Sequence, residues 1–77
     1  MYTEKLSKLS KKEIQVLKLV AEMNTSLEIA EKMKLAPKTV ENHRSNIARK
    51  LNISGNNCVL KFALANKSKL NLESTSR

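Results

Sequence analysis

Residues 25–51 read TSLEIAEKMKLAPKTVENHRSNIARKL, and this stretch decides the fold. Thr25 and Glu28 have the spacing of a capping box, which marks the start of a helix. Pro37 suits the first position of a helix, and the helix that it opens is predicted to end at about Leu51. The apolar residues at helical intervals, expected to face inward, are Ile29, Ala30, Met33, Val40, Ile47 and Leu51. Two helices joined by a tight turn are therefore predicted.

Helices are also predicted on both sides of this stretch. Ser10 and Glu13 have a second capping-box spacing, and the helix that they open continues until Asn24 breaks the pattern. Its inward-facing residues are predicted to be Ile14, Leu17, Val20 and Ala21, widened by Val16, Leu19 and Met23. After a loop that holds the only glycine, a fourth helix is predicted from about Asn57 to Asn66. The sequence thus predicts an all-α fold, a compact domain of four short helices.

The composition indicates the kind of partner and excludes several classes of protein. A chain of 77 residues forms one small domain, and its net charge of +8 favours polyanions, nucleic acid before an acidic membrane surface. With a single cysteine and a single histidine (His43), neither a disulfide, a metal site nor a cofactor is predicted. Without a nucleophile–base pair or glycine-rich loop, no enzyme is expected. The absence of a long apolar run predicts no membrane span and no secretory signal, and so a cytoplasmic protein.

The outward face of the helix predicted over residues 37–51 offers groups that can read DNA. At about 100° per residue, its polar stripe lies roughly 140° to 200° from Val40, and Glu41 flanks the stripe. The stripe consists of Lys38, Asn42, Ser45 and Arg49. Asn pairs with adenine, Lys and Arg with guanine or phosphate, and Glu accepts from cytosine. With the short helix before it, this is the helix-turn-helix pattern, although an ordinary solvated helix face remains the alternative.

Three blocks of sequence carry a more specific signal. They are LSKKEIQVLKLVA at 9–21, TSLEIAEKM at 25–33 and TVENHRSNIARKLNI at 39–53. These blocks resemble the LuxR/FixJ-type helix-turn-helix family, the C-terminal DNA-binding domain of many bacterial response regulators and quorum-sensing regulators. The resemblance implies four helices, of which the second and third form the helix-turn-helix and the fourth is a dimer contact.

The resemblance also sets the expected domain limits. It runs over about residues 9–70, which are expected to form the DNA-binding domain. A basic segment over residues 1–8 is expected before it, and a frayed tail over residues 71–77 after it. Glu13 matches an acidic residue of the family's first helix, which caps that helix or holds an arginine. A receiver or sensor domain that gates dimerisation does not fit in this length, so we expect a stand-alone regulator or the C-terminal part of a longer chain.

By resemblance, two sets of residues are assigned to DNA. The base-reading set is Lys38, Glu41, Asn42 and Ser45, and the backbone set is Thr39, His43, Arg44 and Lys50, to which Arg49 of the polar stripe is added. Arg44 lies about 40° from Val40, on the inward half of the helix, so only its long stem is expected to reach a flanking phosphate.

The fourth helix carries two apolar stripes, whereas a surface helix needs only one. Its predicted dimer residues are Val59, Leu60, Ala63 and Leu64. A homodimer on double-stranded DNA with inverted half-sites is therefore expected. Burial of both stripes within one chain is the alternative.

Several positions depart from the family's pattern. Met23 replaces a common glycine, so Asn24 is expected to supply the left-handed turn. Ala36 replaces a serine cap, and Leu27 replaces a frequent lysine, while Gly55 and Asn56 stand where Ser or Thr and Arg are common. These departures leave a second hypothesis open, a protein-interaction module that uses the same helices without DNA. A σ-factor region-4-like module is disfavoured, because residues 53–70 provide a further helix that it does not need.

Overall fold

Four helices form the part of the chain that this computed structural model describes, residues 6–68. They are α2 (Lys11–Ala21), α3 (Ser26–Met33), α4 (Pro37–Leu51) and α5 (Cys58–Ala65). No strand occurs within residues 6–68, and the predicted all-α class with four helices is confirmed. The predicted tail over residues 71–77 and the first five residues of the basic segment 1–8 lie outside the described residues.

Both predicted capping boxes are present at the starts of α2 and α3. The Ser10 Oγ accepts from the Glu13 N–H at 3.2 Å, and a Glu13 oxygen accepts from the Ser10 N–H at 2.9 Å. The Thr25 Oγ1 accepts from the Glu28 N–H at 3.1 Å, and a Glu28 oxygen accepts from the Thr25 N–H at 2.7 Å. Each box satisfies two backbone groups that a helix start would leave free, which fixes where the two helices begin.

The turn between α2 and α3 differs from the prediction at two residues. Met23 itself adopts the left-handed conformation, with φ of 70°, so the expectation that Asn24 would do so is wrong. Met23 was also predicted to widen the inward stripe, but it is 65% exposed because it lies beyond the end of α2. Asn24 has a different role: its backbone N–H and its side-chain Nδ2 both donate to the Leu19 carbonyl, at 3.1 and 2.9 Å.

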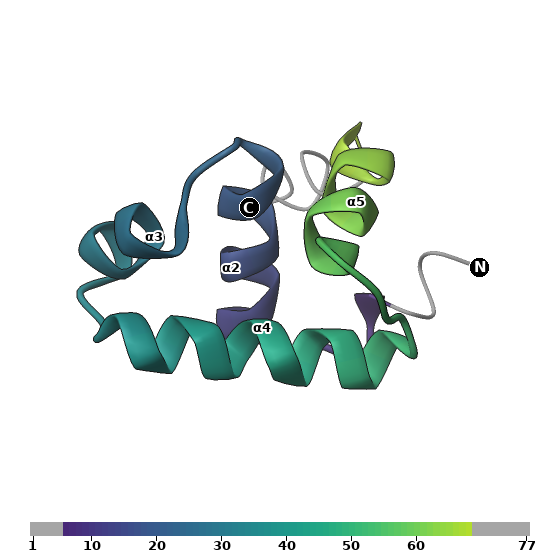
Figure 1. Cartoon of the computed structure of the whole chain (residues 1–77), viewed down its shortest axis with the longest axis horizontal. Coiled ribbons are helices and arrows are strands. Elements are labelled where there is room, and N and C mark those ends of the chain that lie inside the picture. Colours follow the sequence, from purple (N-terminus) through teal and green to yellow (C-terminus); the bar gives the residue numbers. More distant parts are fainter. Residues whose placement is uncertain (1–5, 69–77) are drawn as a thin grey trace.

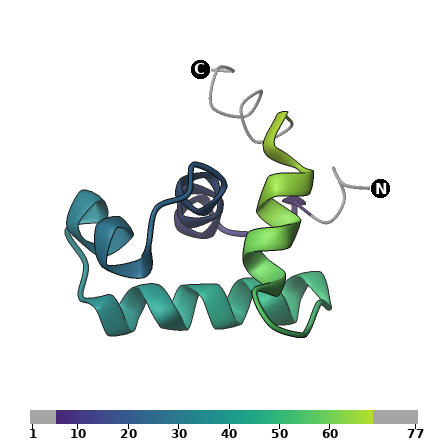
Figure 2. The same ribbon diagram turned by 45° about the horizontal axis from the view of Figure 1, so that its top comes forward.

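The long helix α4 lies across the other three helices. Figure 1 shows α3, α2 and α5 side by side above α4, and Figure 2 shows the same arrangement from another side. α2 packs against all three other helices, and α4 packs against α2, α3 and α5. The core where they meet contains Val16, Leu17, Val20, Ile29, Val40, Ile47, Leu51 and Val59. Leu6, from the segment before α2, is also buried in this core.

The turn between α3 and α4 determines where α4 begins. Lys34 takes the left-handed conformation that ends α3, and the Leu35 N–H closes the turn on the Ala30 carbonyl at 2.8 Å. Ala36 is then the N-cap of α4, followed by Pro37 at the first helical position. Ala36 provides no side-chain hydrogen bond to the helix, as expected from the loss of a serine. The start of α4 is therefore held by its proline and by the turn rather than by a cap.

Candidate nucleic-acid interface

The inward face of α4 fixes the orientation of the helix. Val40, Ile47 and Leu51 are each at most 1% exposed, as predicted from their helical spacing. A helix pinned along one stripe must present the opposite stripe to solvent. The rotation of α4 about its own axis therefore follows from its buried residues.

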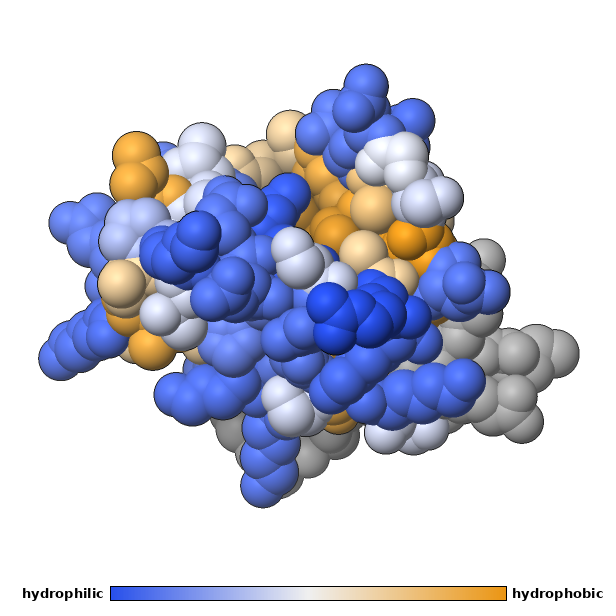
Figure 3. Space-filling model, turned by 60° about the horizontal axis from the view of Figure 1, so that its bottom comes forward, coloured by the Kyte–Doolittle hydropathy of each residue, from blue (hydrophilic) through white to orange (hydrophobic). Residues whose placement is uncertain are grey.

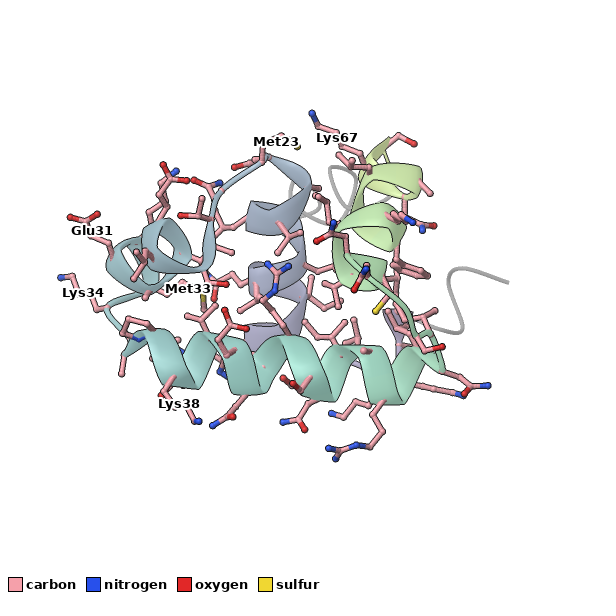
Figure 4. The ribbon with its side chains drawn as sticks, in the orientation of Figure 1. Met23, Glu31, Met33, Lys34, Lys38 and Lys67 are labelled. Atoms are coloured by element: carbon pink, nitrogen blue, oxygen red, sulfur yellow. The ribbon has the colours of Figure 1, made fainter. Side chains whose placement is uncertain are left out.

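The residues predicted to read bases lie on the outward face of α4. All four are exposed: Lys38, Glu41, Asn42 and Ser45. Arg49 and Lys50 are exposed as well. Figure 4 shows Lys38 projecting from α4 away from the other helices, and Figure 3 shows that the face seen with α4 turned forward is largely hydrophilic. The structure thus brings amide, hydroxyl, carboxylate and cationic groups together on one accessible helix surface.

Three residues of the predicted backbone set are only partly exposed. They are Thr39, His43 and Arg44. Arg44 lines a groove of about 270 Å³ together with Met23, Thr25, Ser26 and Leu60. It therefore lies on the side of α4 that faces the α2–α3 turn and α5, away from the exposed stripe. This placement agrees with the angular argument from the sequence, and no described acidic residue forms an ion pair with its guanidinium.

The end of α4 is tied to the start of α2 by an ion pair. Lys50 Nζ lies 2.8 Å from Glu13 Oε1, the same oxygen that accepts from the Ser10 N–H. Burial raises the pKa of Glu13, but the hydrogen bonds from Lys50 and Ser10 and the charge of Lys50 lower it by more. The pKa of Glu13 therefore lies below its usual value of 4.5. Glu13 both caps α2 and holds a cation, and the cation is a lysine of α4.

The pairing of Lys50 with Glu13 was not predicted from the sequence. The sequence did indicate that Lys50 lies at the edge of the core, because it is about 80° from Val40 and so flanks the buried stripe of α4. A lysine beside a buried stripe has its stem against the core and its ammonium near whatever acid lies at the edge. Assigning that acid required the packing of α2 on α4, which sequence spacing alone does not give. Contact of Lys50 with a DNA phosphate stays a prediction.

Neither a metal site nor a membrane-spanning helix is found among the described residues. Between residues 6 and 68 there is no group of His, Cys, Asp and Glu side chains that could hold a metal ion. None of the helices described is both long and apolar enough to cross a membrane.

Comparison with known proteins places the chain in a family. The model of the family described as "Bacterial regulatory proteins, luxR family" matches residues 7–63. The chain is 41% identical over 59 residues to the oxygen regulatory protein NreC of Staphylococcus carnosus, covering 77% of this chain and 27% of that protein. It is 40% identical over 58 residues to the uncharacterized response regulatory protein YgeK of Escherichia coli, covering 75% of this chain and 40% of YgeK. No solved structure matches the chain.

The relatives are longer than the matched region. With NreC of Staphylococcus aureus strain JH9 the match extends over 65 residues at 37% identity, which is 84% of this chain and 30% of that protein. The chain thus spans less than half the length of each of these relatives.

Proposed function

Because the chain belongs to the luxR family of bacterial regulatory proteins, we propose that it recognises a specific sequence in double-stranded DNA with α4 in the major groove. The membership itself makes the chain a DNA-binding helix-turn-helix domain of a transcription regulator, and this family is not enzymatic. The observation that carries the proposal is the exposed polar stripe of α4, opposite a buried stripe that fixes the helix's rotation.

The chemistry of the stripe suits base edges. Asn42 can pair with adenine through its amide, and Lys38 can donate to the acceptors of guanine. Glu41 can accept from the amino group of cytosine, and Ser45 can pair with several bases. A helix about 10–12 Å across fills a major groove about 12 Å wide, so these side chains reach the base edges when α4 lies along the groove.

The residues of the predicted backbone set are assigned to the sugar–phosphate backbone. Arg49 projects from the exposed stripe, and Thr39 and His43 flank it. Arg44 lines one groove at the α2–α3 turn and another at the loop before α5, and it reaches a phosphate from that side of α4. Lys50 contacts a phosphate while it stays near Glu13, because an ammonium has three donors.

A binding titration tests whether the chain uses phosphate contacts. Fluorescence anisotropy of labelled duplexes is measured at increasing salt concentrations. We expect the logarithm of the binding constant to fall linearly with the logarithm of the salt concentration, by about 0.9 for each phosphate neutralised. Binding that is absent, or that does not depend on salt, would contradict the proposal.

We propose further that two copies pair through α5 on an inverted-repeat site. Val59 and Ala63, two of the predicted dimer residues, are buried in the chain's own core and hold α5 in place. The other two remain accessible: Leu60 is partly buried and Leu64 is 44% exposed. A hydrophobic area on the α5 side of the polar face is visible in Figure 3. Monomers seldom leave such an area uncovered, and a two-fold contact would cover it.

The dimer proposal has a matched pair of variants. Leu64→Ser removes an apolar group from the proposed contact, whereas Leu27→Ser removes a 68% exposed leucine from α3. Sedimentation of the protein with a half-site duplex and with an inverted-repeat duplex shows whether the second chain binds cooperatively. We expect wild type and Leu27→Ser to fill the two half-sites cooperatively, and Leu64→Ser to fill them independently. Cooperative filling by Leu64→Ser would contradict pairing through Leu64.

The greater length of the relatives raises the question of whether this chain is part of a longer protein. Since the matched region covers 27% to 40% of NreC and YgeK, we propose that a receiver or sensor domain precedes this one in a longer cytoplasmic regulator. The reading frame upstream of the codon for Met1 tests this directly. A stop codon just upstream would contradict it.

A further inference from the structure

A groove of about 520 Å³ lies beside α2, nearly twice the volume of the one next to Arg44. Its apolar lining comes mainly from the partly exposed Ile14, with the accessible edges of Leu6 and Leu9, which precede α2 and are only 5% and 9% exposed. Lys11 and Lys18 contribute cationic side chains to the same groove. A space of this size accepts several apolar side chains of a partner.

The groove lies apart from the surface proposed to bind DNA. None of its lining residues belongs to α3, α4 or α5. At about 100° per residue, Lys11, Ile14 and Lys18 share the side of α2 that faces away from Val16 and Val20. Since α2 packs Val16, Leu17 and Val20 into the core, the groove opens on the side of α2 opposite Val16 and Val20. A molecule bound there would leave the exposed stripe of α4 free.

The charged residues that line the groove in the described part of the chain are both cationic. No acidic residue lines it, and neither Lys11 nor Lys18 forms an ion pair with any residue between 6 and 68. The nearest acid along the chain, Glu13, points to the other side, where it pairs with Lys50. Exposed Lys8 and Lys12 adjoin the groove in sequence. These lysines account for part of the +8 charge that α4 does not carry.

We propose that this groove binds an acidic amphipathic helix of a partner protein. Apolar side chains at intervals of three and four residues would contact Leu6, Leu9 and Ile14, while flanking carboxylates would face Lys11 and Lys18. The apolar lining favours a protein segment over nucleic acid, because a sugar–phosphate backbone has no apolar side chains to place there. The domain would then hold DNA through α4 and a second protein through α2 at the same time.

Two designed peptides test the groove on the whole 77-residue chain. The first is a fluorescein-labelled helical peptide with leucine at positions i, i+3, i+4 and i+7 and mostly glutamate elsewhere. The second has alanine in place of each leucine and the same charge. We expect saturable binding of the first peptide and at least about tenfold weaker binding of the second, because only the first offers large apolar side chains. Equal binding of both would show charge attraction alone and overturn the proposal.

A pair of charge-matched variants locates the binding surface. Lys11→Glu with Lys18→Glu reverses the charge of the groove. Lys32→Glu with Lys34→Glu makes the same charge change on two exposed lysines, one in the last turn of α3 and one directly after it. Thermal melting of each variant shows whether it is folded. We expect the groove variant to bind the leucine peptide at least about tenfold more weakly than the α3 variant. Equal weakening by the two variants would contradict a site at the groove.

Chemical-shift mapping on the unaltered chain keeps the test independent of folding. In the ¹⁵N-labelled protein, the leucine peptide is expected to shift amides of residues 6–18, and a random-sequence duplex amides of residues 37–51. Peptide shifts scattered over all helices, or duplex shifts concentrated in residues 6–18, would overturn the proposal. The second result would assign the groove to nucleic acid instead.

Discussion

Met23 adopts a backbone conformation that suits glycine better than methionine. Its φ is 70°, and its side chain is 65% exposed, so packing contributes little to offset the steric cost of the left-handed conformation. Met23→Gly is therefore expected to raise the free energy of unfolding by about 1 kcal/mol, measured by urea denaturation.

A control separates the backbone effect from the loss of an exposed side chain. Met23→Ala also removes the side chain but keeps a Cβ, which clashes in the left-handed conformation. We expect no comparable gain for Met23→Ala. A gain equal to that of Met23→Gly would show that the strain at φ of 70° is not the cause.

The ion pair between Glu13 and Lys50 makes stability depend on pH. The pKa of Glu13 is lowered in the folded state, so its contribution is complete above the unfolded value of about 4.5 and is lost as the pH falls through the folded pKa. Glu13→Gln keeps an oxygen that can accept from the Ser10 N–H but removes the charge. It is expected to cost about 1 kcal/mol near pH 7, because Lys50 is 41% exposed and the pair is partly screened.

Urea denaturation at several pH values measures this contribution. The difference in free energy of unfolding between wild type and Glu13→Gln should shrink below about pH 4.5, where the wild-type carboxylate takes up its proton. Groups common to both proteins titrate alike and cancel in the difference. A difference that stayed constant down to about pH 3 would show that the charge of Glu13 contributes nothing.

At the scale of the element, the start of α4 lacks a cap. Ala36 occupies the N-cap position without a side-chain hydrogen bond, while Ser10 and Thr25 cap α2 and α3. Ala36→Ser and Ala36→Asp should each raise the free energy of unfolding by about 1 kcal/mol, because both side chains accept from the free N–H groups.

The same two variants are expected to differ in their effect on DNA. The start of α4 is proposed to lie in the major groove, so a carboxylate at position 36 would be repelled by the phosphates. Anisotropy titration should show weaker binding for Ala36→Asp than for Ala36→Ser. Equal affinities of the two variants would place the start of α4 away from the DNA.

The sequence predicts a helix well when the interactions that form the helix lie between residues close together in the chain. The two capping boxes, Pro37 and the stripe of Val40, Ile47 and Leu51 act within one helix, so their spacing was enough to predict α2, α3 and α4. The prediction that Asn24 would take the left-handed conformation was wrong. Met23 takes it instead, and this glycine-like conformation depends on the hydrogen bonds that Asn24 makes to the Leu19 carbonyl.

Some features of the candidate site also follow from a single helix, whereas others depend on how the helices pack. The exposed residues of α4 followed from helical angles, because a buried stripe determines its opposite. The partner of Lys50 and the position of Arg44 beside the α2–α3 turn depend on how separate helices pack. Those contacts join residues far apart in the sequence, and spacing along one helix does not contain them.

Across the whole molecule, most of the positive charge lies outside α4, the helix that is proposed to read DNA. Of fifteen Lys and Arg residues, only Lys38, Arg44, Arg49 and Lys50 belong to α4, where Glu41 opposes them. The net charge of +8 explains attraction to a polyanion but not the choice of sequence. We therefore propose that the choice of sequence comes from the base-reading residues on the outward face of α4, above all Asn42.

Selection of bound duplexes from a random pool shows whether the outward face of α4 reads bases. We compare wild type with Asn42→Ala and with the control Asn56→Ala, an exposed asparagine of the loop before α5. Wild type and Asn56→Ala are expected to select one shared motif. Asn42→Ala should lose preference at a single base pair per half-site, worth about 1–3 kcal/mol, and keep the others. An identical motif for all three proteins, or no enriched motif at all, would contradict reading by this face of α4.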